Sequence, residues 1–84
     1  MLFRSTIKFN VPDINGRKNH ISIKIYDALG KQIRNLLEKR IKGGMHQICW
    51  DGKNDFGDAV SSGIYFYELN SGKFRQLKKM LLLR

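Results

Sequence analysis

The chain has 84 residues, and its 16 Lys and Arg against 7 Asp and Glu give a formal net charge of +9. This length allows one small domain over residues 1–84, while the hydrophobic fraction of 42% exceeds that of a disordered tail. The single cysteine, Cys49, excludes an internal disulfide and a paired-cysteine metal motif. The positive charge would attract polyanions, but basic side chains on exposed strands also prevent aggregation, and we favour this simpler interpretation.

Two segments in the first third of the chain alternate apolar with polar residues, as half-buried strands do. Their apolar members are Ile7, Phe9, Val11, Ile21, Ile23 and Ile25. Pro12 ends the first segment because it lacks an N–H for a strand ladder, and a polar loop over residues 13–19 follows. Asp27–Gly30 is predicted to be a turn with glycine at its last position.

Residues 31–42 allow two interpretations. Ile33, Leu36, Leu37, Arg40 and Ile41 fall at helical spacing, and no residue between Lys31 and Lys42 breaks a helix. Periodicity alone therefore favours an amphipathic helix, and the resemblance described below favours a strand.

The second half contains three further predicted strands. Gly43 and Gly44 open the first, in which His46, Ile48 and Trp50 share one face and Met45, Gln47 and Cys49 the other. Residues 64–70 are apolar on both faces at first, which predicts a central strand or one covered on both sides. Ser71 and Gly72 are expected to form a tight hairpin before a last strand over residues 74–83.

We find no pattern that predicts catalysis, a metal site or a cofactor site. Asp51, Asn54, Asp55 and Asp58 could offer oxygen ligands to a cation such as calcium, but such residues more often close turns, and we favour the turn. His20 and His46 lack an obvious third ligand, and His46 is expected to be partly buried and hydrogen-bonded. Cys49 is expected to be a small buried apolar residue, so we predict a non-enzyme.

The basic residues gather in two groups. They are Lys31, Arg34, Lys39, Arg40 and Lys42, and then Lys73, Arg75, Lys78, Lys79 and Arg84. Exposed Tyr26 or Phe74 beside them could stack on single-stranded nucleic acid, but no RNA-recognition or oligonucleotide-binding motif is present. No stretch is long enough for a membrane span, and Met1–Arg4 leads directly into a strand pattern without a signal peptide.

The longest recognisable run is WDGKNDFGDAVSSGIYFYEL, preceded by GGMHQIC and followed by KFRQLKKMLLLR. With STIKFNVPD and ISIKIYDALGKQIRNL upstream, it resembles the C-terminal sorting domain of type IX secretion cargo. It equally resembles the related immunoglobulin-like domain of flagellar hook-capping proteins. The resemblance implies an all-β fold, an immunoglobulin-like β-sandwich of six to seven mostly antiparallel strands, with a strand over residues 31–36 and irregular structure over 37–42.

The sorting-domain resemblance implies a folded address label that directs a cargo through the type IX secretion system. The implied partners are the translocon, a sortase-like protease and a covalently fused upstream cargo. The implied path leads through the periplasm to the outer membrane or cell surface, in bacteria of the Bacteroidetes type. The alternative is a structural accessory domain of hook-capping type that mediates protein–protein contacts. We also expect a monomer, anionic surface polysaccharide as a candidate ligand, and no specific nucleic acid.

Carried over to this sequence, the resemblance assigns translocon recognition to the basic and apolar ending, Lys79, Met80, Leu81, Leu82, Leu83 and Arg84. It assigns the structural motif to Trp50, Asp51, Gly52, Gly57, Gly63, Tyr65 and Tyr67. The family often has an Asn-Pro-rich segment before the first strand, where this chain has Met1–Arg4. The predicted inner faces include Ile7, Phe9, Ile21, Ile23, Ile25, Ile48, Trp50, Tyr65, Tyr67 and Leu69.

Overall fold

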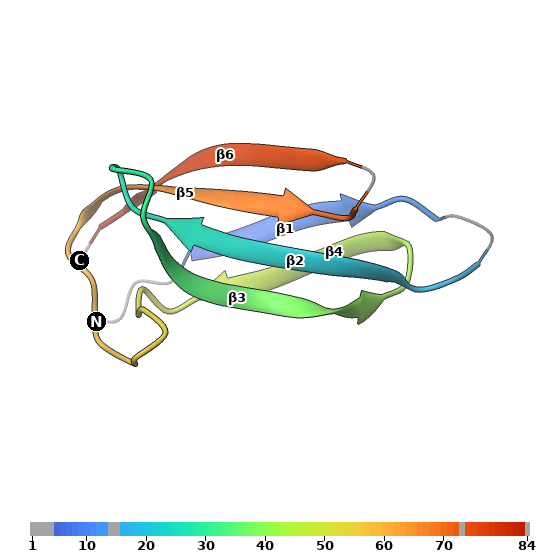
Figure 1. Cartoon of the computed structure of the whole chain (residues 1–84), viewed down its shortest axis with the longest axis horizontal. Coiled ribbons are helices and arrows are strands. Elements are labelled where there is room, and N and C mark those ends of the chain that lie inside the picture. The colour runs from blue at the N-terminus through green and yellow to red at the C-terminus, as the bar shows by residue number, and fades with distance from the viewer. Residues whose placement is uncertain (1–4, 14–15, 73, 84) are drawn as a thin grey trace.

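Two antiparallel β-sheets face each other in the computed structural model, which describes residues 5–13, 16–72 and 74–83 (Figure 1). The six strands are β1 (Ser5–Val11), β2 (Asn19–Tyr26), β3 (Gln32–Ile41), β4 (Gly44–Trp50), β5 (Gly63–Asn70) and β6 (Arg75–Leu82). This architecture confirms the predicted all-β sandwich. Met1–Arg4, Lys73, Arg84 and residues 14–15 of the predicted polar loop lie outside the described residues.

The smaller sheet pairs β1 with β4, and the larger sheet has the order β3-β2-β5-β6. The chain therefore crosses between the sheets after β1, after β3 and after β4, and forms hairpins at β2–β3 and β5–β6. β5 lies between β2 and β6, which confirms that it is a central strand. Its outer face is open to solvent at Ile64, which is 45% exposed.

The core lies between the two sheets and consists of the inward members of the alternating strands. Its buried residues are Ile7, Phe9, Val11, Ile21, Ile23, Ile25, Trp50, Tyr65, Leu69 and Leu82. Ile48 and Tyr67, also predicted for the inner faces, are half-buried and pack against this core. Val11, which the alternation of the first strand placed with Ile7 and Phe9, is buried as expected, and Leu82 completes the core.

β3 confirms the strand predicted up to Leu36 and corrects both the helix and the irregular structure predicted beyond it. It is one strand through Ile41, neither a helix nor a strand that gives way to a loop after Leu36. Its register with β2 shifts twice, and the shifts leave Leu36 and Ile33 as extra residues on β3. Such β-bulges break the period of two. Ile33, Leu36, Leu37 and Ile41 can therefore all pack against the core at a spacing that imitates a helix.

Three further expectations need correction. Cys49 is exposed rather than buried, because it lies on the outer face of the two-stranded sheet opposite Thr6, where no further layer covers it. Phe74 is half-buried against the core, so it offers no free stacking surface. The last strand begins at Arg75 and ends at Leu82, one residue inside the predicted bounds at each end.

Candidate contact surface

The loop between β4 and β5 is held by the aromatic side chains at its two ends. Trp50 is fully buried, and its Nε1–H donates to the carbonyl oxygen of Lys53 at 2.9 Å. The Trp50 ring meets the Tyr65 ring edge-on at a centroid distance of 5.3 Å, and the Tyr65 hydroxyl donates to the carbonyl oxygen of Ser61 at 2.6 Å. This part of the predicted motif is a structural anchor.

Acidic and amide side chains of this loop close its turns, as predicted from the sequence. The Asp51 carboxylate accepts the N–H of Lys53 at 3.1 Å. The Asn54 side-chain oxygen accepts the N–H groups of Phe56 and Asp58, both at 3.0 Å. Gly52 and Gly57 have φ of +75° and +86°, values that glycine adopts without steric cost. These contacts hold the turns of the loop.

The same loop docks on the outer edge of β3. The N–H of Asp55 donates to the carbonyl oxygen of Ile33, and the Asp55 carboxylate accepts the N–H of Asn35, both at 2.9 Å. Arg34 reaches across to the carbonyl oxygens of Lys53 and Asn54 at 3.4 and 3.1 Å. Arg34 therefore belongs to the loop anchor and is not a free member of the basic group predicted around it.

The ionisable side chains form no metal-binding cluster in the part of the chain that the structure describes. No three His, Cys, Asp or Glu residues there come together as ligands. His46 is half-buried, stacks on Phe9, and its Nε2 lies 2.7 Å from the carbonyl oxygen of Lys42, which confirms a hydrogen-bonded histidine. Burial raises the pKa of Tyr67 above its ordinary value of 10.0. Within the same residues, no helix could cross a bilayer.

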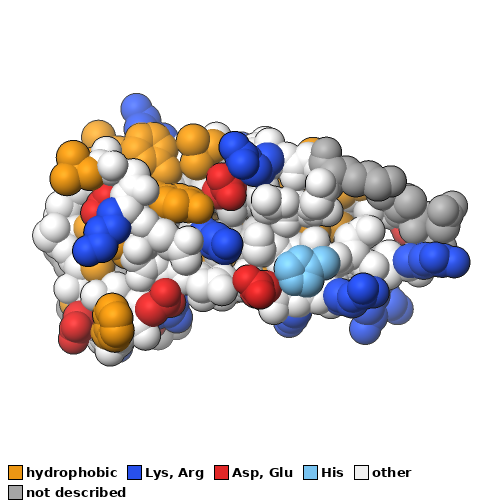
Figure 2. All heavy atoms as spheres, viewed as in Figure 1, with side chains coloured by type: hydrophobic (Ala, Val, Ile, Leu, Met, Phe, Trp, Pro, Cys, Tyr) orange, Lys and Arg blue, Asp and Glu red, His pale blue; other side chains and the backbone are white. Residues whose placement is uncertain are grey.

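The outer face of the four-stranded sheet carries a patch of apolar side chains that are exposed or, for Tyr26 and Phe66, half-buried. We define the apolar patch as Tyr26, Leu29, Ile64, Phe66, Leu77 and Leu81. Figure 2 shows hydrophobic side chains gathered at one end of this face, where Lys and Arg side chains are interspersed among them. Leu77 is 63% exposed and Leu81 59% exposed, although both lie in a regular strand. The alternation of β6 turns them outward, since their register partners Glu68 and Ile64 also face outward.

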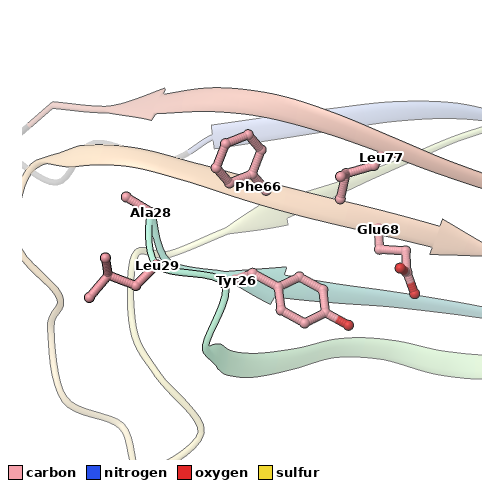
Figure 3. A pocket seen from close by; sticks show the side chains of 7 residues that line it. Tyr26, Ala28, Leu29, Phe66, Glu68 and Leu77 are labelled. Atoms are coloured by element: carbon pink, nitrogen blue, oxygen red, sulfur yellow. The ribbon is translucent and has the colours of Figure 1, made fainter.

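A pocket of about 450 Å³ lies within the apolar patch. Figure 3 shows Tyr26, Phe66 and Leu77 projecting from β2, β5 and β6 beside the Ala28 and Leu29 turn. The Glu68 carboxylate at its rim forms an ion pair with Arg75 at 3.5 Å. A second hollow of about 230 Å³ lies on the other side of the same turn, where Ile64 and Ser61 contribute to the wall.

Leu29 occupies the most exposed position in this region. The turn is held by the Asp27 carboxylate, which accepts the N–H groups of Leu29 and Lys31 at 3.0 and 2.9 Å, and by Gly30 at φ +87°. These bonds fix the backbone without using the leucine side chain, which is 95% exposed. An apolar side chain that projects into solvent from a fixed turn beside a pocket is suited to contact another protein. Sequence reasoning treated Leu29 only as a turn residue and missed it.

The residues that the resemblance assigned to translocon recognition divide between surface and core. Lys79 and Leu81 are exposed on the outer face of β6, and Leu83 is exposed just beyond it. Leu82 is 1% exposed and belongs to the core, while Met80 is half-buried against it. Arg84 lies outside the described residues. No contact in the structure tests their assigned role, which stays a prediction.

Comparison with known proteins supports the resemblance to the immunoglobulin-like domain of flagellar hook-capping proteins. Residues 4–73 match the model of the FlgD Ig-like domain family. The crystal structure of FlgD from P. aeruginosa is similar at a TM-score of 0.73 and 19% identity, which shows a shared fold. That alignment covers 94% of this chain and 60% of the other, so the chain spans less than two thirds of the related protein. No curated protein sequence matches the chain. Neither match concerns type IX secretion, and the chain belongs to the FlgD Ig-like domain family.

Proposed function

We propose that this chain is a non-catalytic immunoglobulin-like module of the flagellar hook-capping type, which holds proteins together through the apolar patch. Family membership supports the structural role. The observation that carries the proposal is the pocket between Tyr26, Phe66 and Leu77, with Leu29 fully exposed beside it. Apolar side chains arranged around a hollow on a sheet face gain free energy when a partner covers them.

The proposal is tested by site-specific photocrosslinking in the protein that carries this domain, within its own bacterium. A photoreactive amino acid replaces Leu29, or Met45 as the matched control. Met45 is 72% exposed but lies on the outer face of the opposite sheet. We expect one discrete adduct with a flagellar structural protein from position 29 and none from position 45. Equal labelling from both positions, or adducts without flagellar proteins, would contradict the proposal.

An in-frame deletion of the domain tests the biological role. If the domain belongs to a hook-capping assembly, electron microscopy should show missing or malformed hooks, and the remainder of the protein should still reach its normal location. Normal hooks would refute the hook-capping role. Genes for other flagellar components beside the parent gene would support it at once, whereas a long exported reading frame upstream would support sorting.

Sorting through the type IX system is the second candidate, favoured by the exposed basic and apolar face of β6. The direct test places the chain behind a signal peptide and a reporter in a type IX-competent bacterium. Deletion of Lys79–Arg84 would remove Leu82 from the core and could unfold the domain. The double substitution Lys79→Glu/Leu81→Asp changes only exposed side chains. Surface display that is lost in this variant, measured by external protease, supports sorting, and retention of the intact fusion refutes it.

A further inference from the structure

The two edges of the four-stranded sheet differ in how they are covered. At the β3 edge, Asp55 forms hydrogen bonds with the backbone carbonyl oxygen of Ile33 and the backbone N–H of Asn35. At the β6 edge, no loop of the described residues makes a backbone hydrogen bond, and β6 pairs with β5 alone. In an antiparallel edge strand, alternate N–H and C=O groups point away from the sheet, where they can pair with another strand.

The side chains of β6 limit which strand can be added there. On its outer face, Lys79 lies between Leu77 and Leu81, all three of them exposed. On its core-side face, Lys78 is exposed next to the half-buried Met80. Glu68 is the acidic residue nearest to this row, and it pairs with Arg75. Among the residues described, Lys78 and Lys79 therefore have no acidic partner.

We propose that the free edge of β6 binds an extended segment of a partner protein with two adjacent acidic residues flanked by apolar ones. This inference rests on the proposed function and names the chemistry of the partner. Residues paired across two strands lie on the same face of the sheet. An antiparallel partner strand therefore places two apolar residues opposite Leu81 and Met80, then two acidic residues opposite Lys79 and Lys78. A third apolar residue lies opposite Leu77, beside the pocket of the apolar patch (Figure 3).

A second copy of the chain is a poorer occupant of this edge. Two β6 strands paired with each other would bring their lysines close together, and like charges across a pair are destabilising. The net charge of +9 on each copy adds repulsion at longer range. A general polyanion would satisfy the lysines but would leave Leu77 and Leu81 uncovered. The interleaved lysines and leucines instead match a strand of mixed acidic and apolar character.

The test measures binding of a fluorescently labelled extended peptide, of sequence Thr-Leu-Val-Asp-Glu-Ile-Thr, to the 84-residue chain by anisotropy. Saturable binding should weaken as salt is added, because exposed charge pairs are screened. Lys78→Glu/Lys79→Glu should reduce the affinity about tenfold or more. A peptide with two lysines in place of its acidic residues should bind this variant better than the original chain. Rescue by the charge-swapped peptide separates a lost contact from a misfolded variant.

The matched control is Lys39→Glu/Arg40→Glu, which reverses two adjacent exposed charges on the other edge strand. It should change the affinity less than twofold, and bound peptide should slow amide exchange in β6 but not in β3. An equal loss in both double variants, or competition by heparin without competition by the unlabelled peptide, would show general polyanion affinity and overturn the proposal. Absence of saturable binding would also overturn it. In that case, a specific crosslink from position 29 would still support the contact function.

Discussion

Trp50 is the residue on which the β4–β5 loop depends, because it combines full burial, an aromatic contact with Tyr65 and a hydrogen bond to Lys53. Trp50→Ala should lower the free energy of unfolding by roughly 3–5 kcal/mol, since it leaves a large cavity. Urea denaturation followed by far-UV circular dichroism measures the loss. Phe56 is the control, because its ring is 89% exposed in the same loop, and Phe56→Ala should change stability by less than about 0.5 kcal/mol. A loss below about 1 kcal/mol for Trp50→Ala would contradict its role as the anchor.

Tyr67 gives a residue-scale prediction for the pH dependence of stability. Burial raises the pKa of its phenol above 10.0 in the folded protein, because the charged phenolate is poorly solvated there. The folded state therefore holds the proton more tightly than the unfolded state. The resulting stabilisation is fully present below about pH 10 and is lost as the pH rises through the folded-state pKa. As the pH rises above 10, the Tyr67→Phe variant should therefore lose less stability than the original chain does. Parallel profiles in denaturant titrations from pH 8 upward would refute this.

At the scale of elements, the docking of the β4–β5 loop on β3 depends on Asp55. Asp55→Ala removes the acceptor for the N–H of Asn35 and should cost about 0.5–1.5 kcal/mol. Asp58→Ala is the matched control, because among the described contacts its carboxylate accepts no hydrogen bond although its backbone N–H bonds to Asn54. Thermal melts of both variants give the comparison, and amide exchange at Asn35 should speed up only in the first. If both variants lose stability equally, the loop charge rather than the docking bond is responsible.

A second feature of the elements is the close approach of the β3–β4 connection to the loop after β1. A Cβ added at Gly43 would lie 2.5 Å from the Cα of Asp13, a backbone atom that cannot yield easily. Glycine is therefore required at position 43 by space, whereas its neighbour Gly44 has open space but φ of +121°. The diglycine that the sequence suggested as the start of a strand thus has two separate physical roles.

At the scale of the whole molecule, the charge of +9 and the sheet architecture predict an all-β chain that stays monomeric. Far-UV circular dichroism should show a β spectrum, and sedimentation equilibrium should give the mass of one chain, 9.8 kDa. Added salt screens the repulsion, so any weak association should appear first at high ionic strength. A dimer at low salt would contradict both the expected monomer and the argument against a second copy at the β6 edge.

The sequence by itself determined the strands whose alternation is set by local chemistry. Ile21, Ile23 and Ile25 alternate with polar residues, and all three are fully buried. The turn at Asp27–Gly30 and the loop from Asp51 to Asp58 also followed from local rules, because Asp and Asn side chains bond to backbone groups only a few residues away. The resemblance added the sandwich and its family, which no single motif determined.

Only the tertiary structure decided which faces are covered and which edges are free, because these depend on partners far away in the chain. The bulges of β3 arise in its pairing with β2, so its apolar spacing was ambiguous from sequence. Cys49 is exposed because no layer covers the outside of the two-stranded sheet. Gln76 is exposed although it pairs with the buried Leu69, because the two-stranded sheet is too narrow to cover β6 along its whole length. The apolar patch combines β2, β5, β6 and a turn, which only long-range pairing brings together.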